Sequence, residues 1–190
     1  HWTPGNAVAQ RSERLGLAFD SEVVRAQYQE MIAAYEEAGV NVYQSPAEAG
    51  LPYQVYARDS SVMTPWGAII MQMEKPYRRG EYAAVLRFYL EHGIPIYDMV
   101  NAGHVEGGDF MVLKPGVAIC GYSGERSIEP AVNQLKNWFE AEGWEFMTYA
   151  FDPHFLHLDV QMGMIAEDLA VVCGEGVEPG LVDWLKSKQI

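Results

Sequence analysis

Cysteine and positive charge are scarce in this sequence of 190 residues, which holds two cysteines and 13 Lys and Arg residues against 26 Asp and Glu residues. Two cysteines are too few for a disulfide framework. Cys120 and Cys173 each end an apolar run, so we expect buried free thiols in a cytoplasmic protein. The net charge of −13 argues against nonspecific nucleic-acid binding, which needs a basic surface, and against an anionic membrane.

Long hydrophobic runs are absent as well. No apolar run approaches the roughly 18 residues of a membrane span, and the start His-Trp-Thr-Pro-Gly lacks a signal-peptide pattern. The sequence does not begin with Met, as expected of a chain that starts inside a longer gene product. Hydrophobic residues still make up 49%, which supplies a core and excludes a disordered chain.

The sequence repeats a helix, a glycine and a short strand. Helical spacing of apolar residues covers 20–38, 80–92 and 129–142. The glycines that close these helices are Gly39, Gly93 and Gly143. The strands that follow them are Val40–Tyr43, Ile94–Tyr97 and Trp144–Met147. This recurrence predicts an α/β fold of stacked modules, each of roughly 50 residues.

Two further patterns extend the repeat. Asp109–Leu113 and Val117–Gly121 flank the turn Lys114–Gly116, which predicts a hairpin. A fourth helix begins at Pro179, and the sequence stops where its strand is expected. A closed ring of such modules leaves no exposed sheet edge. The alternative is an ordinary α/β domain whose helices end in glycine.

Carboxylates gather in two short motifs. Tyr56-Ala-Arg-Asp59 ends an apolar run, and Glu106-Gly-Gly-Asp109 precedes the hairpin. Glycine permits a tight turn, so Glu106 and Asp109 can converge on one side. The alternatives are a surface ion pair for the first motif and an acidic turn for the second.

A histidine stands beside another carboxylate in the segment Phe155–Asp159. If this segment is extended, His157 and Asp159 point to the same face. Such a pair suits general acid/base chemistry, whereas a buried structural histidine is the alternative. A zinc site is disfavoured because the sequence has no His-x-x-x-His and no Cys-x-x-Cys pair.

Arginines complete the set of candidate residues. Arg126 lies in Gly121–Ser127, just before the third helix, and Arg78 and Arg79 follow Glu74-Lys-Pro-Tyr. A guanidinium can bind a carboxylate through two parallel hydrogen bonds, although these arginines could equally cap loops. Several carboxylates that face one cavity require cations, and a guanidinium is a planar cation whose donors match carboxylates in pairs.

With these four motifs in this order, the sequence resembles the guanidino-group-modifying enzymes, also called the amidinotransferase or pentein superfamily. Its dimethylarginine dimethylaminohydrolase and arginine deiminase branches are the most similar. The matching segments are Tyr56–Asp59, Glu106–Asp109, Gly121–Ser127 and His157–Asp159, and the resemblance covers roughly residues 20–190.

The resemblance implies a five-bladed α/β propeller with its site at the centre. Residues 1–190 would then form a single propeller domain that contains about three and a half repeats and is truncated at both ends. It implies hydrolysis of guanidino C–N bonds in arginine or an arginine derivative, in an enzyme of arginine metabolism that uses no cofactor and no metal. A cysteine thiolate attacks the guanidinium carbon in this family.

The resemblance also implies a role for each candidate residue. His157 would be the general acid/base, oriented by Glu106, and Asp59 would hold the guanidinium nitrogens together with Asp159. Asp109 would belong to the same acidic wall. The candidates for binding the substrate carboxylate are Arg126, Arg78 and Arg79.

The family's nucleophile is missing from this sequence. Neither Cys120 nor Cys173 occupies its position, which lies near the C-terminus after a glycine-rich stretch. We therefore expect the 190 residues alone to be inactive.

Other functions remain open at this stage. The chain could belong to an amidinotransferase, to a non-catalytic binding domain of the same fold, or to a metal-dependent hydrolase. The expected partner is a small cationic guanidino substrate, and unpaired sheet edges would permit a homo-oligomer.

Overall fold

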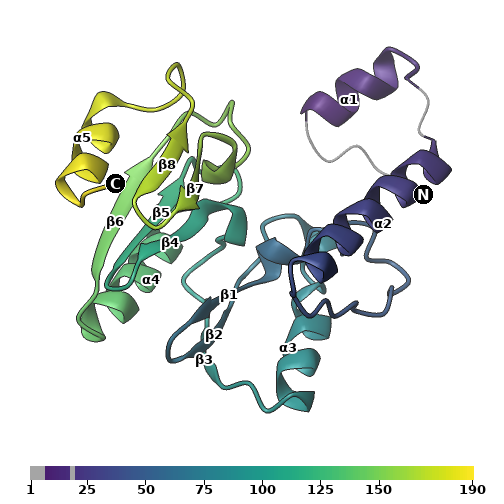
Figure 1. The fold of residues 1–190 in the computed structure, drawn as a ribbon, viewed down its shortest axis with the longest axis horizontal. Helices are drawn as coiled ribbons and strands as arrows, with labels where there is room; N and C mark the ends of the chain where they lie inside the picture. The colour runs from purple at the N-terminus through teal and green to yellow at the C-terminus, as the bar shows by residue number, and fades with distance from the viewer. Residues whose placement is uncertain (1–6, 18–19) are drawn as a thin grey trace. The chain divides into compact units, whose positions relative to one another are not determined.

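A computed structural model describes residues 7–17 and 20–190. The chain divides into two compact units, His1–Ala47 and Glu48–Ile190 (Figure 1). No helix in the part of the chain that the structure describes is long and apolar enough to cross a membrane.

The first unit consists of two helices, α1 (Ala7–Arg14) and α2 (Ser21–Glu37). Asp20 caps α2, because its carboxylate accepts hydrogen bonds from two backbone N–H groups of the first turn. The expected strand Val40–Tyr43 is wrong. These residues pair with no strand among the described residues, and a strand without a partner leaves its backbone polar groups unsatisfied.

The second unit contains two copies of the same supersecondary module. In the first, β1 (Ser61–Thr64) and β2 (Gly67–Ile70) form a hairpin, and α3 (Tyr82–Glu91) leads to β3 (Ile96–Met99), which pairs parallel to β2. In the second copy the hairpin strands, the helix and the parallel strand are β4 (Phe110–Lys114), β5 (Val117–Tyr122), α4 (Glu129–Ala141) and β6 (Glu145–Ala150).

A third module begins with the hairpin β7 (Met162–Ala166) and β8 (Leu169–Val172), followed by α5 (Pro179–Ser187). The expected hairpin after Asp109 and the expected helices are therefore confirmed. The second and third predicted strands exist, although they begin one or two residues later than expected. Gly39, Gly93 and Gly143 all have positive φ, as closing glycines require.

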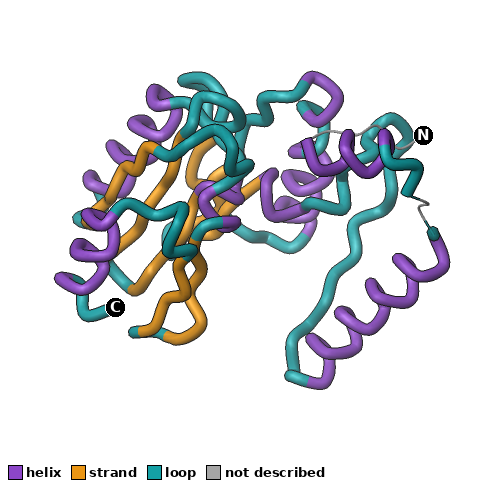
Figure 2. Tube along the Cα trace, turned by 90° about the horizontal axis from the view of Figure 1, so that it is seen from above, coloured by secondary structure: helices purple, strands orange, loops and turns teal. Residues whose placement is uncertain are grey.

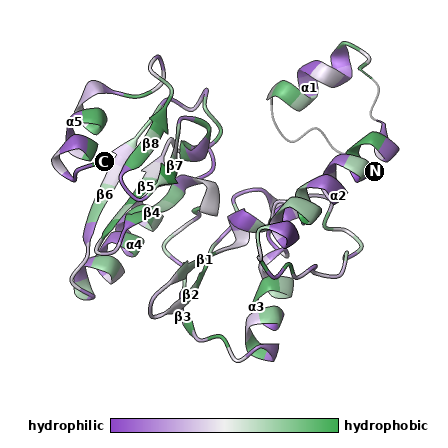
Figure 3. Ribbon diagram, viewed as in Figure 1, coloured by the Kyte–Doolittle hydropathy of each residue, from purple (hydrophilic) through white to green (hydrophobic). Residues whose placement is uncertain are grey.

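Two of the helices, α4 and α5, bury an apolar face, whereas α2 and α3 bury one residue each, Ile32 and Ala84. Val132, Leu135 and Phe139 of α4 share one core cluster with Ile69 of the first sheet and Phe146 of the second. Leu181 and Leu185 of α5 pack in the same way against the second sheet and the third hairpin, within a second core cluster. Within the second unit, α4 and α5 therefore flank the strands (Figure 1, Figure 2), and β2, β5 and β8 carry mostly hydrophobic residues (Figure 3).

Two expectations about the third module are wrong. Cys120 is buried in β5 as expected, but Cys173 is exposed because it follows β8 at the end of the hairpin. The segment from His157 to Asp159 is not a strand. It leads into the short 3-10 helix η4 (Leu158–Val160), whose turn is closed by hydrogen bonds from Val160 N to His157 O and from Gln161 N to Leu158 O.

Candidate active site

The first strand of each hairpin is preceded by a short 3-10 turn that carries an aspartate. These turns are η1 (Ala57–Ser60) with Asp59, η3 (Gly107–Asp109) with Asp109, and η4 with Asp159. Because the modules repeat side by side, the three turns lie together, with η3 in contact with both η1 and η4. The candidate site is therefore built from equivalent positions of three successive modules.

Asp59 is buried in this cluster. Its Oδ1 accepts a hydrogen bond from Gly108 N at 3.0 Å, and its Oδ2 lies 3.0 Å from Nη1 of Arg78. The neighbouring Arg58 does not pair with Asp59, so the alternative interpretation of this motif as a local surface ion pair is wrong. Its Nε instead pairs with Asp159 at 3.2 Å.

Glu106 is fully buried at the centre of the cluster. Its Oε2 lies 3.2 Å from Arg78 Nη1 and 3.3 Å from Arg126 Nη1, and its Oε1 accepts a hydrogen bond from Glu74 N. Burial raises the pKa of Glu106. The charges of Arg126 and Arg78 oppose that effect without cancelling it, and the carboxylate of Asp59 adds to it.

His157 lies between the carboxylates. Its Nδ1 donates to Asp109 Oδ2 at 3.1 Å, while its Nε2 faces Glu106 Oε2 at 3.5 Å and Asp59 Oδ1 at 3.9 Å. Burial lowers the pKa of His157, but the hydrogen bond and charge of Asp109, together with Asp59 and Glu106, outweigh burial and raise it overall. The protonated imidazolium is therefore more favoured here than in a solvent-exposed histidine.

Asp109 fixes the turn that carries this histidine. Its Oδ1 accepts a hydrogen bond from Leu158 N at 2.9 Å, and its Oδ2 also accepts one from the Ser127 hydroxyl. Ser127 Oγ in turn accepts from Glu106 N at 3.1 Å. The geometry thus places Asp109 on the Nδ1 side of His157, and Glu106 on the Nε2 side.

The two glycines of the Glu-Gly-Gly-Asp motif permit close approach of the neighbouring turns. A Cβ on Gly107 would lie 2.0 Å from the backbone oxygen of Arg58. A Cβ on Gly108 would lie 2.8 Å from Cγ of His157 and 3.1 Å from Oδ1 of Asp59. Any larger residue would therefore push the turns apart.

Asp159 stands at the rim of the site and not in the buried cluster. Its side chain is about one-third exposed at 34% and pairs with Arg58, which also donates to the backbone oxygen of Phe110. Burial raises the pKa of Asp159, against the lowering effect of His157 and Arg58.

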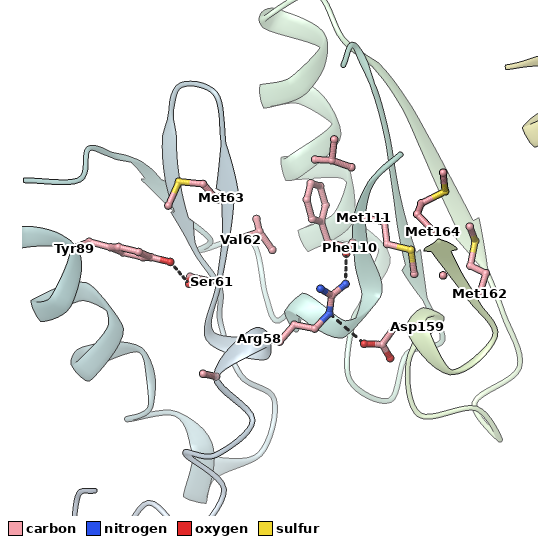
Figure 4. Close-up of a pocket in the computed structure, with 13 residues that line it drawn as sticks. Arg58, Ser61, Val62, Met63, Tyr89, Phe110, Met111, Asp159, Met162 and Met164 are labelled. Atoms are coloured by element: carbon pink, nitrogen blue, oxygen red, sulfur yellow. Dashed lines mark hydrogen bonds and ion pairs between the residues drawn. The ribbon is translucent and has the colours of Figure 1, made fainter. Parts of the chain in front are cut away.

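The Arg58–Asp159 ion pair lines an open cavity of about 810 Å³ (Figure 4). Methionines of β1, β4 and β7 form much of its wall: Met63, Met111, Met162 and Met164.

The three predicted arginines lie in different surroundings. Arg78 is buried against Glu81, Asp59 and Glu106, and Arg126 is buried against Glu106. Arg79 is exposed and donates one hydrogen bond to the backbone oxygen of Glu74.

Two residues of the network are absent from the sequence-based prediction. Glu81 contacts Arg78 through Nε and Nη2, and Ser127 joins Glu106 to Asp109. The spacing Arg78-x-x-Glu81 at a helix start was a usable signal, because residues three apart face each other on a helix. Ser127 carried no such signal.

A metal ion is a poor fit to this cluster. Ligand atoms of Asp59, Glu106 and His157 lie within 4.8 Å of one another, as a metal site requires. The guanidiniums of Arg78 and Arg126 already contact Glu106, however, and they would repel a divalent cation. A divalent ion bound here would therefore have to compete with both guanidiniums for Glu106.

Comparisons with known proteins identify the family of this chain. The family model "N,N dimethylarginine dimethylhydrolase, eukaryotic" matches residues 3–180. The uncharacterized protein YkgA of Bacillus subtilis is 28% identical over 162 residues, which are 85% of this chain and 55% of that protein. An uncharacterized protein of Aeropyrum pernix is 29% identical over 66% of this chain and 47% of its own. The chain thus spans about half the length of these curated relatives.

Solved structures share the fold. The dimethylarginine dimethylaminohydrolase of Pseudomonas aeruginosa, complexed with citrulline, superposes with a TM-score of 0.76 at 21% identity, over 86% of this chain and 64% of that one. The N-terminal domain of ArgZ, a cyanobacterial arginine dihydrolase bound to its product, gives 0.76 at 15% identity, over 88% and 61%. The chain therefore belongs to the N,N-dimethylarginine dimethylhydrolase family of the guanidino-group-modifying (pentein) superfamily.

Proposed function

We propose that the protein to which this chain belongs hydrolyses a guanidino C–N bond of arginine or an arginine derivative. The observation that carries the proposal is the convergence of Asp59, Glu106, Asp109 and His157, all buried, at the starts of successive modules. Buried carboxylates need a cation, and His157 supplies the proton transfer that cleavage of a C–N bond requires.

The contacts suggest a role for each group. Asp59 would bind the guanidinium nitrogens, with Asp159 contributing from the rim. His157 would protonate the leaving amine, with Asp109 fixing its ring and Glu106 stabilising the positive charge. Arg126 and one of Arg78 or Arg79 would bind the carboxylate of the substrate; Arg79 has the exposed side chain of these three.

The reaction proposed is covalent. A thiolate attacks the guanidinium carbon, the amine leaves with a proton from His157, and water hydrolyses the thiouronium intermediate. Cys120 is unsuited to this attack because it is fully buried and burial raises the pKa of its thiol. Cys173 is exposed after β8 and is not part of the buried cluster. We propose that the nucleophile belongs to a part of the protein outside these residues.

The fold proposal follows the same reasoning. The chain contains two complete modules and the start of a third, and the 3-10 turn of each module contacts the 3-10 turn of the next. This arrangement fits part of a five-bladed propeller. We propose that such a propeller closes in the whole protein.

Two alternatives would use the same carboxylates. An amidinotransferase would use the same residues but admit an amine in place of water. A non-catalytic binding domain would need the carboxylates, but it would not need a histidine held between them. A metal-dependent hydrolase is disfavoured by the charges of Arg78 and Arg126 at Glu106.

The experiment is an assay of citrulline formation from L-arginine and from N,N-dimethylarginine. It uses the protein encoded by the full gene and, separately, the 190-residue chain. We expect turnover by the former only, abolished by His157→Gln; ammonia or dimethylamine as co-product identifies the substrate. Turnover only with an added acceptor amine would favour the amidinotransferase. Turnover by the pure 190-residue chain would contradict the proposal that the nucleophile lies outside these residues.

A further inference from the structure

The acidic cluster already contains a guanidinium, that of Arg78. Its Nη1 lies 3.0 Å from Asp59 Oδ2 and 3.2 Å from Glu106 Oε2. The Arg78 side chain is 5% exposed, so these contacts are made almost without water. A guanidino ligand would present the same donors to the same two oxygens.

Glu81 holds the opposite edge of this guanidinium. Its carboxylate accepts from Arg78 Nε at 3.0 and 3.2 Å and from Nη2 at 2.9 Å, and its side chain is 1% exposed. The two sides of the guanidinium therefore have different partners. Nε and Nη2 pair with Glu81, whereas Nη1 pairs with Asp59 and Glu106. Loss of the Nη1 contacts would leave Arg78 charged, paired and in place.

We propose that Arg78 is the resident occupant of the guanidinium subsite, and that a guanidino ligand binds by displacing Arg78 Nη1 from Asp59 and Glu106 while Glu81 retains the rest of the group. This inference rests on the proposed function, because it takes a guanidinium as the ligand. Arg78 and Arg126 already share Glu106 Oε2, so a further guanidinium at these oxygens would bring a third like charge into the cluster unless Arg78 Nη1 leaves.

The displacement has a consequence for specificity. A simple guanidine displaces Arg78 Nη1 from its two carboxylates and provides no new hydrogen-bond acceptor for it. A ligand that also carries a carboxylate can pair with the displaced Nη1, which Glu81 holds beside the site. The resident arginine would thus favour zwitterionic guanidino acids over simple guanidines.

The first test is the double variant Arg78→Gln/Glu81→Gln, with binding measured by calorimetry for methylguanidine and for L-arginine. It removes one charge of each sign, so the net charge of the cluster is preserved. The matched control is Arg87→Gln/Glu48→Gln, which removes an exposed ion pair of the same type at 3.1 Å.

We expect the dissociation constant of methylguanidine to fall about tenfold in the double variant. This corresponds to a parent chain in which Arg78 leaves the subsite open in about one tenth of the molecules, and a variant in which it is always open. L-arginine should gain less, so the preference for arginine over methylguanidine shrinks, and the control should match the parent chain. An unchanged or weaker affinity for methylguanidine in the double variant overturns the proposal.

The second test needs no substitution, so it survives if the variant fails to fold. Nitrogen-15 NMR follows the guanidinium of Arg78 while methylguanidine is added. We expect its Nη1 protons to exchange faster with water while the Nε and Nη2 protons stay protected by Glu81. If ligand binds and the Nη1 protons stay protected, Arg78 does not move and the proposal is wrong. If the parent chain and the double variant bind no guanidine at all, the proposed function itself fails, and this inference with it.

Discussion

Asp109 accepts hydrogen bonds both from the ring of His157 and from the backbone of the residue that follows it. One carboxylate oxygen accepts from the imidazole Nδ1 at 3.1 Å, and the other accepts from the backbone N–H of Leu158, the next residue, at 2.9 Å. A single carboxylate therefore fixes both the ring and the turn that carries it. Because Asp109 ends η3 and His157 precedes η4, this pair also joins two successive modules.

Removal of the Asp109 charge should lower the pKa of His157. In Asp109→Asn the burial of the imidazole remains, while the strongest group that raises its pKa is lost. The pKa is read from the pH dependence of the imidazole proton shifts in NMR. Asp168→Asn, at an exposed turn position, is the control and should leave the titration unchanged. Equal titration curves for Asp109→Asn and the parent chain would contradict the assigned contact.

The stability of the chain should fall as pH rises through the pKa of His157. The folded state raises this pKa above the ordinary value of 6.5, so the folded chain binds the proton more tightly than the unfolded chain. The resulting stabilisation is complete below about pH 6.5 and is lost above the folded pKa. Urea unfolding from pH 5.5 to 9 measures it. His157→Gln should flatten this part of the profile, whereas the exposed His154→Gln should not.

Gly108→Ala should disturb the site, because the new methyl group would lie 2.8 Å from His157 Cγ. We expect a loss of about 1–3 kcal/mol in the free energy of unfolding from this overpacking, together with a changed titration of His157. Gly163→Ala in β7 is the control, since no atom lies within 4 Å of the added Cβ. Similar stability losses in both variants would show that the close approach at Gly108 is not what requires glycine.

Ser127→Ala should destabilise the chain by about 1–3 kcal/mol, because it leaves the buried Glu106 N–H without its acceptor. Ser187→Ala removes an exposed hydroxyl at the end of α5 and should cost much less. Chemical denaturation of both variants measures the difference. A loss in Ser127→Ala no greater than in Ser187→Ala would remove Ser127 from the network.

Only one of the two thiols should react in the folded chain. Cys173 is exposed, whereas Cys120 is fully buried and burial raises its pKa. We expect iodoacetamide to label one site per folded chain and two after unfolding, as counted by intact mass. Cys173→Ser should abolish labelling of the folded chain; persistent labelling would contradict the burial of Cys120.

Periodicity predicted the helices and hairpins because their signals are local. The helices α3 and α4, their closing glycines and the β4–β5 hairpin all follow from spacing within about fifteen residues. Val40–Tyr43 shows the limit of this approach. It has the alternation of a strand, but strand formation depends on a partner elsewhere in the chain.

Four central members of the candidate site were predictable from the sequence, but Glu81, Ser127 and the contacts between the members were not. Asp59, Glu106, Asp109 and His157 all lie in one buried cluster. Which carboxylate meets which ring nitrogen depends on how three turns, far apart in sequence, pack together. For the same reason, Arg58 pairs with Asp159 and not with its neighbour, and Arg78 lies inside the acidic cluster.

The most direct test of the account is the binding of L-arginine to the 190-residue chain, measured by calorimetry beside L-norleucine, which lacks the guanidinium. The account predicts binding of arginine and none of norleucine at the same concentration. It further predicts that Asp59→Asn weakens arginine binding by about tenfold or more, the effect of about 1.4 kcal/mol. Equal binding of the two amino acids, or undiminished binding of arginine by Asp59→Asn, would contradict a guanidinium site at this cluster.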